Sequence, residues 1–224
     1  MNYTFLLGNG FDLSMGLRTS YRDFLRVYQA APSNSESIRQ AKTALFDQLG
    51  PRAELWADLE RALGMLSSRF PHNSEGLHQF YSLQNDLVEH LHQYFLTENS
   101  RAQVAAHQEE ILQAFANLRA TLREHLTPEG RQSLETLRHT LPVRQNNHDA
   151  FRFVTFNYTT VLDQCLALVT RARRELSLPG QIDWGHVQDV LHIHGTMGQR
   201  IILGVDNLEQ IPNDFGKSEE LKLG

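Results

Sequence analysis

Three short polar segments contain the residue types that could carry chemistry. They are GNGFD at residues 8–12, FNYT at 156–159 and HGT at 194–196. Glycines let backbone N–H groups approach a phosphate, an asparagine amide both donates and accepts hydrogen bonds, and a histidine can take up a proton near neutral pH. Together these residue types are suited to holding a phosphorylated small molecule and moving a proton on it.

The first segment follows directly on residues 4–7, which are apolar or β-branched and are suited to a buried strand at the start of the fold. A strand that ends in Gly-x-Gly commonly brings backbone amides close to a phosphate, although Gly8 and Gly10 could instead serve only a tight turn with positive φ. Leu13 stands where a GxGxxG dinucleotide motif has its third glycine, so this is not a standard dehydrogenase signature.

Hydrophobic periodicity indicates the elements that must position the three segments. We expect an open loop from GNGFD to Ser20, where Ser20 and Asp23 form a capping box that starts a helix. Periodicity from about residue 35 to 140 is helical throughout, which predicts a set of antiparallel helices. Further strands are expected at 151–156, 190–194 and 200–203, with a helix over about 159–171.

This order of elements predicts an α/β fold, a Rossmann-like and mostly parallel sheet with a large all-α helical insertion. Residues 1–34 and 146–224 are expected to form a discontinuous nucleotide-binding domain, and residues 35–145 the insertion. In such sheets the ligand lies beyond the carboxyl ends of the strands, so the three polar segments should converge on one cleft.

Each candidate residue also has a structural alternative. Asp12 could cap local backbone amides, and Asn157 could be a turn residue at the end of a strand. His194 could be a core histidine, since His192 and His194 would alternate on one strand and point the same way. This pair lacks a third ligand at suggestive spacing, so no metal is expected.

Composition narrows the class of partner. The formal net charge is −5, and the dense basic run is confined to residues 171–174, so nucleic acid is not the expected partner. The single cysteine, Cys165, permits no disulfide within one chain and is typical of a reducing cytoplasm. We recognise no signal peptide and no apolar run of about 18 residues, so no membrane span is expected.

Four segments in order give the chain a resemblance to a known family: GNGFDLSMGLRTSYRDF, LWADLE, FVTFNYTTVLD and HIHGTMGQRIILGVDN. In this order they resemble the AbiH family of bacterial abortive-infection proteins, which act against phage. Members of that family usually continue beyond such a segment, so the resemblance implies either a shortened form or a partner that covers an edge of the sheet.

The AbiH family is in turn similar to the sirtuin-like NAD-consuming superfamily. This likeness implies that Asn157 meets the nicotinamide ribose, that His194 acts as a base, and that the glycine loop holds the dinucleotide phosphates. The residues it implies for nucleotide binding are Gly8, Asn9, Gly10, Asp12, Thr155, Tyr158 and Gly195. The sirtuin zinc module is absent and Phe156 and Tyr158 replace the residues that flank the asparagine in deacylases, which argues against deacylation.

The resulting hypothesis is a cytoplasmic anti-phage protein that hydrolyses the nicotinamide glycosidic bond of NAD when triggered, with NAD as substrate and without a metal. Its expected partners are a nucleotide and, for assembly or triggering, a second copy or a phage-sensing protein. One alternative is a nucleotide-binding sensor or interaction module without turnover. Another is a metal-dependent nuclease, in which Asp12, Asp58, Glu60 and His194 would gather a divalent ion.

Overall fold

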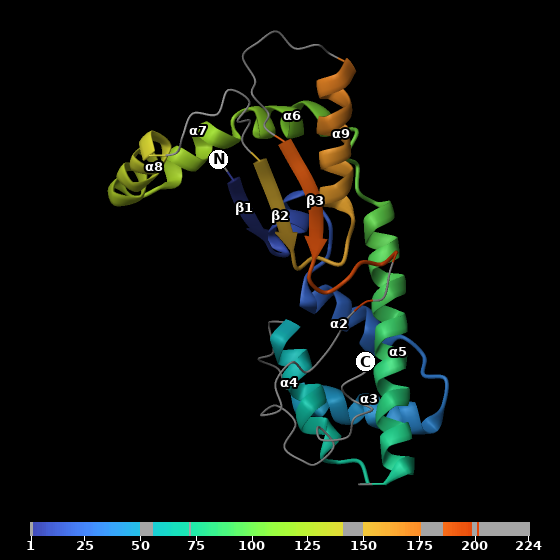
Figure 1. Cartoon of the computed structure of the whole chain (residues 1–224). Helices are drawn as coiled ribbons and strands as arrows, with labels where there is room; N and C mark the ends of the chain where they lie inside the picture. Colours follow the sequence, from blue (N-terminus) through green and yellow to red (C-terminus); the bar gives the residue numbers. More distant parts are fainter. Residues whose placement is uncertain are drawn as a thin grey trace. The chain divides into compact units, whose positions relative to one another are not determined.

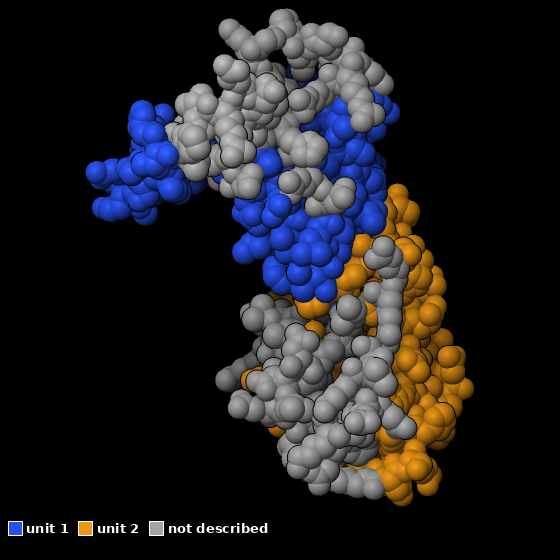
Figure 2. All heavy atoms as spheres, in the orientation of Figure 1, with its two compact units in different colours: residues 1–16, 101–193 blue, residues 17–100, 194–224 orange. Residues whose placement is uncertain are grey.

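The computed structural model describes residues 2–49, 56–71, 73–140, 150–175, 186–198 and 201. The chain divides into two compact units, the first made of residues 1–16 and 101–193 and the second of residues 17–100 and 194–224 (Figure 2). The boundaries of these units differ from the domain boundaries expected from the sequence. The expected domains therefore stay a prediction.

A small parallel sheet lies at the centre of the first unit (Figure 1). Its strands are β1 (Asn2–Leu7), β2 (Ala150–Thr155) and β3 (His186–His192), hydrogen-bonded in that order. Both pairings are parallel, and Leu7 pairs with Thr155, which pairs with His192. The expected strand over 151–156 is therefore confirmed. The expected strand at 200–203 lies outside the described residues apart from residue 201, which is in no strand.

The first unit also contains the helices α1 (Gly10–Ser14), α6 (Gln108–Ala116), α7 (Leu118–His125), α8 (Pro128–Thr140) and α9 (Val161–Glu175). Residues of α1, α6, α7 and α9 join the apolar core that lies on the sheet. On β2, Phe151 and Phe153 are buried whereas Arg152 between them is exposed, as the period of a strand requires. The two phenylalanines form a core cluster with Leu162 and Leu166 of α9. This burial fixes α9 against the sheet, because the apolar face of each would otherwise meet water.

The segment after β1 differs from the open loop that the sequence predicts, because it contains the short helix α1. The amide of Leu13 donates to the carbonyl of Asn9 at 3.1 Å, which closes the first helical turn. The helix ends at Ser14 with Met15 as its C-cap, and the next residue, Gly16, has a φ of 79°, a conformation that glycine adopts at little cost. The carboxylate of Asp12 in the first turn also suits the positive end of a helix.

The second unit contains the helices α2 (Tyr21–Ala30), α3 (Glu36–Leu49), α4 (Trp56–Ser67) and α5 (Ser74–Ser100). The predicted cap is confirmed, since Ser20 Oγ accepts a hydrogen bond from the amide of Asp23 at 3.2 Å. The helical reading of this part of the sequence is confirmed as well. The core of the unit includes these buried side chains: Phe24, Tyr28, Leu45, Leu59, Leu83, Leu87, Leu91 and Phe95.

Overall, the described chain is a mixed α/β protein, mostly helical, with a small parallel sheet of three strands. None of its described helices combines the length and the apolar composition needed to cross a bilayer.

Candidate functional site

The parallel sheet brings two of the three polar segments to one edge. Leu7 ends β1 and its register partner Thr155 ends β2, so GNGFD and FNYT both leave the sheet at the same end. The amide of Phe156 still donates to the carbonyl of Leu7 at 3.0 Å, which holds the two departing segments together. The convergence expected for these two segments is therefore present in the structure.

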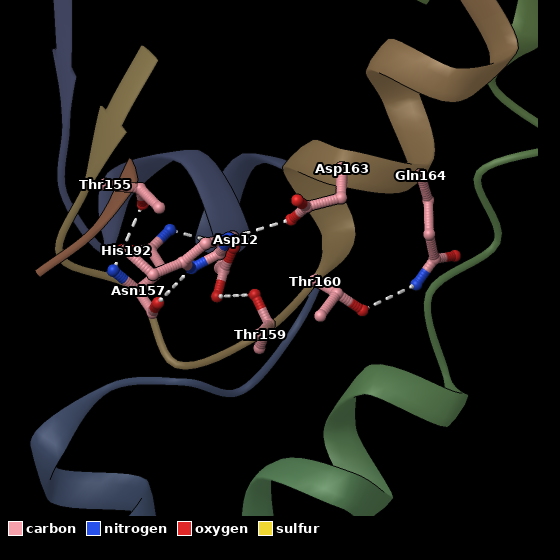
Figure 3. Close-up of polar contacts among 8 residues, drawn as sticks. All are labelled: Asp12, Thr155, Asn157, Thr159, Thr160, Asp163, Gln164 and His192. Atoms are coloured by element: carbon pink, nitrogen blue, oxygen red, sulfur yellow. Dashed lines mark hydrogen bonds and ion pairs between the residues drawn. The ribbon is translucent and has the colours of Figure 1, made fainter. Parts of the chain in front are cut away.

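Asp12 is the centre of the resulting polar cluster (Figure 3). Asn157 Nδ2 donates to Asp12 Oδ1 at 2.9 Å, and Thr159 Oγ1 donates to Asp12 Oδ2 at 2.7 Å. The exposed fractions of Asp12, Asn157 and Thr159 are 1%, 6% and 1%. Each carboxylate oxygen of Asp12 thus accepts a hydrogen bond from a side chain of the FNYT segment. These two bonds differ from the alternative in which Asp12 caps backbone amides of its own loop.

Burial determines the electrostatics of this carboxylate. Loss of hydration raises the pKa of Asp12 above its ordinary value, while the bonds from Thr159 and Asn157 and the nearby His192 act in the opposite direction. The neighbouring thiol of Cys165 is also buried, and its pKa rises to about 11, first because of burial and second because of the charge of Asp12. The cluster is therefore a poorly hydrated place in which hydrogen bonds to an anion are strong.

Asn157 is held by its backbone as well as by its amide. Its backbone N–H donates to Thr155 Oγ1 at 3.1 Å, and both residues are buried. Its side-chain oxygen, Oδ1, is buried and has no hydrogen-bond partner. An unpaired buried acceptor of this kind is uncommon in a folded protein and calls for an explanation.

An imidazole–carboxylate pair adjoins Asn157, and the sequence did not point to it. His192 Nε2 lies 3.1 Å from Asp163 Oδ2, and His192 Nδ1 lies 3.4 Å from the backbone oxygen of Asn157 (Figure 3). Both ring nitrogens thus face acceptors, whereas a neutral imidazole can donate through only one of them. The available signal was weak: an acidic residue in the first turn of α9, and a histidine at the end of a strand packed beside that helix.

His194 does not occupy the position that the sequence predicted. The strand β3 ends at His192, so the expectation that both histidines alternate on one strand is wrong. The chain turns instead, because Gly195 adopts a φ of 72°. His194 and Gly195 belong to the second unit, in which His92 Nε2 lies 2.6 Å from the nearby backbone oxygen of Met197. His194 lies two residues beyond the end of β3, whose last residue His192 is the register partner of Thr155.

Gly8 and Gly10 adjoin open space. A Cβ atom built on either glycine would meet nothing within 4 Å, and neither residue has a positive φ. The positive-φ alternative considered for them is therefore wrong. Asn9 lies between them, and Tyr158 is buried next to Asn157.

The residues considered for a metal site belong to both units: Asp12 to the first, and Asp58 and Glu60 of α4 to the second. Within the described ranges, no group of three or more His, Cys, Asp and Glu residues could hold a metal ion.

The fold and the cluster together define a mixed α/β protein with a buried polar site at the carboxyl end of a parallel sheet. Residues 4–222 match the family described as bacteriophage abortive infection AbiH, and the chain belongs to this family. The family indicates a role in phage abortive-infection defence. Searches of curated proteins and of solved structures returned no match.

Proposed function

We propose that this AbiH protein hydrolyses the nicotinamide glycosidic bond of NAD during the abortive response to phage infection. The observation that carries the proposal is the buried Asn157 amide, whose oxygen has no partner, at the strand ends next to the glycine loop. In the proposal the sheet is part of a Rossmann-like, sirtuin-type nucleotide-binding domain, and the reaction takes place in the bacterial cytoplasm.

Binding of NAD in this proposal rests on the loop after β1. The open space at Gly8 and Gly10 supports close approach of a pyrophosphate to the backbone N–H groups of this loop, including that of Asn9. Such contacts need no basic side chain, so the net charge of −5 is compatible with them. The remaining residues proposed to line the nucleotide site are Asp12, Thr155, Tyr158 and Gly195.

The reaction breaks the bond between the anomeric carbon of the ribose and the nicotinamide nitrogen, and nicotinamide leaves with the electron pair. The transition state resembles an oxocarbenium ion, and a water adds to the anomeric carbon while its proton passes to a base. Asn157 would orient the ribose and this water through hydrogen bonds. His194 is the proposed base, and His192 is a second imidazole that must be tested because it adjoins Asn157.

The experiment is to incubate the purified full chain with NAD and to follow free nicotinamide by chromatography. The variants are Asn157→Ala, His194→Gln and His192→Gln, with His107→Gln as a matched control because His107 is a partly exposed histidine outside the cluster. We expect the wild-type chain and the control to release nicotinamide at equal rates. Asn157→Ala should lower the rate by at least about a hundredfold, within the range that positioning residues contribute.

The outcomes separate this proposal from its alternatives. Loss of activity in His194→Gln but not in His192→Gln would identify His194 as the base, and the reverse result would identify His192. Binding of NAD without release of nicotinamide would instead favour a sensor, which acts alone or with a partner that detects the phage. Absence of both binding and turnover would refute the proposal.

A further inference from the structure

In the hydrogen bond between Asn157 and Asp12, the amide of Asn157 is the donor and the carboxylate of Asp12 is the acceptor. An ionised carboxylate has only acceptors, so the side of the Asn157 amide that faces Asp12 must be the donor Nδ2, as the 2.9 Å bond shows. The reversed amide would place Oδ1 of Asn157 against Oδ1 of the buried Asp12 carboxylate, and neither of these two oxygens would then have a donor from the other residue. The other oxygen of Asp12 accepts a hydrogen bond from the hydroxyl of Thr159, which does not contact the Asn157 amide through that bond.

This direction determines what remains for another molecule. With one N–H of Nδ2 given to Asp12, the oxygen of the Asn157 amide faces away from that carboxylate, and this atom is buried and has no partner. A buried acceptor without a donor is destabilising, so a donor supplied by a bound molecule would be favoured there. The backbone of Asn157 is fixed by its bond to Thr155 Oγ1, which limits any other way of relieving the unpaired oxygen.

We propose that Asp12 is a positioning residue whose carboxylate orients the Asn157 amide, so that Oδ1 accepts a hydrogen bond from a hydroxyl group of the bound sugar. This inference rests on the proposed function for the identity of the ligand, a ribosyl nucleotide. It adds a residue role and a rule of recognition: the group bound at Asn157 is a hydrogen-bond donor. A sugar in which that hydroxyl is replaced by a group that only accepts is rejected.

The first variant, Asp12→Asn, keeps the shape of the side chain and removes its charge. An amide at position 12 can satisfy Asn157 and Thr159 in either of two orientations, so the amide of Asn157 is no longer fixed. Thr159→Val is the matched control, because it removes a donor to Asp12 and leaves Asp12 opposite Asn157. The double variant Asp12→Asn with Asn157→Asp tests for rescue, since a carboxylate at position 157 can again only accept.

The measurement is the affinity of the full chain for NAD and for NAD analogues with the 2′- or the 3′-hydroxyl of the nicotinamide ribose replaced by fluorine, by calorimetry at pH 8. We expect the wild type to bind NAD at least about tenfold more tightly than one of the analogues, as sites built around a hydroxyl do. Asp12→Asn should reduce this preference to about twofold. Thr159→Val should keep it, and the double variant should restore it.

A second readout does not depend on NAD. The side-chain amide protons of Asn157 are assigned in the NMR spectrum by their absence in Asn157→Ser, with the exposed Asn34 as reference. We expect slow hydrogen exchange of the Asn157 amide in the wild type and in Thr159→Val, and exchange at least about tenfold faster in Asp12→Asn. The exposed Asn34 amide should be unaffected by all three changes.

The two readouts separate failure of this inference from failure of the proposed function. If the wild type binds neither NAD nor its analogues, the proposed function is refuted, and the exchange rates alone decide whether Asp12 orients Asn157. If NAD binds but Asp12→Asn alters neither the preference for the hydroxyl nor the exchange of the Asn157 amide, the positioning role of Asp12 is refuted.

Discussion

Asn157 and Asp12 are joined by a hydrogen bond of 2.9 Å although 145 residues separate them along the chain. The bond connects the segment after β1 to the segment after β2, and both segments leave the sheet at the same end. Its formation therefore depends on correct pairing of two strands that lie far apart in the sequence. Perturbation of this cluster should be visible both in stability and in the chemistry proposed for the site.

The hydroxyl of Thr159 should contribute measurably to stability because it donates to a buried carboxylate. We expect Thr159→Val to lower the free energy of unfolding by about 1.5–3 kcal/mol at pH 8, the range for hydrogen bonds to charged groups. Chemical denaturation followed by circular dichroism measures this. The control is Thr43→Val, because Thr43 is an exposed helical residue whose hydroxyl donates to the carbonyl of Arg39, and this change should alter stability by no more than about 0.5 kcal/mol.

Asp12 should make stability depend on pH in an unusual direction. Burial raises its pKa, so between its unfolded pKa of about 3.9 and the raised folded pKa the native state binds more protons than the unfolded state. Stability contributed by protonated Asp12 is then present at low pH and is lost as pH rises through the folded pKa. The groups that face this carboxylate are Thr159, Asn157, His192 and Cys165.

Asp12→Asn removes this titration. As pH rises from about 4, the wild type should therefore lose stability relative to Asp12→Asn. This change in the difference between their unfolding free energies should level off above the folded pKa of Asp12. Denaturation curves of both proteins between pH 4 and pH 8 test this. A difference that does not change with pH would contradict the raised pKa.

Cys165 should be inert in the native state. Its pKa of about 11 leaves very little thiolate at pH 8, whereas an unfolded cysteine has a pKa of about 8.5. We expect a soluble aromatic disulfide reagent to label the native chain at least about a hundredfold more slowly than the chain in denaturant. Because this is the single cysteine of the sequence, the labelling reports on one site. Rapid labelling under native conditions would contradict its burial.

Phe153 should be a main contributor to the core of the first unit. Its ring stacks on that of Phe5 with a centroid separation of 5.2 Å and also lies near Phe115. We expect Phe153→Ala to cost about 3–5 kcal/mol, as large truncations in a core do. Leu6→Ala is the control, because Leu6 lies on the same sheet but is 72% exposed, and it should cost no more than about 0.5 kcal/mol.

Local signals in the sequence were sufficient for much of the fold. The strand β2 (Ala150–Thr155) alternates buried residues with partly or fully exposed ones, and Ser20 with Asp23 forms a cap that depends on neighbours three positions apart. The helices of the second unit follow from apolar residues repeated every three to four positions. These features were predictable because each is determined over a few residues.

The site was predictable only in part. Asp12 and Asn157 were expected near each other because residues that follow parallel strands leave a sheet at the same edge, and the structure joins them directly. The pairing of His192 with Asp163 was not foreseen, because it depends on how α9 packs beside β3. The end of β3 at His192, which places His194 in a turn, was missed for the same kind of reason.

The sequence alone therefore determined the kinds of element and the segments that carry polar chemistry, through periodicity and capping. Only the tertiary structure decided that the Asn157 amide uses its nitrogen on Asp12 and leaves its oxygen unpaired. It also decided that His192 adjoins the backbone oxygen of Asn157. The physical reason is that hydrogen-bond direction and burial depend on atoms brought together from distant parts of the chain, and no local pattern encodes them.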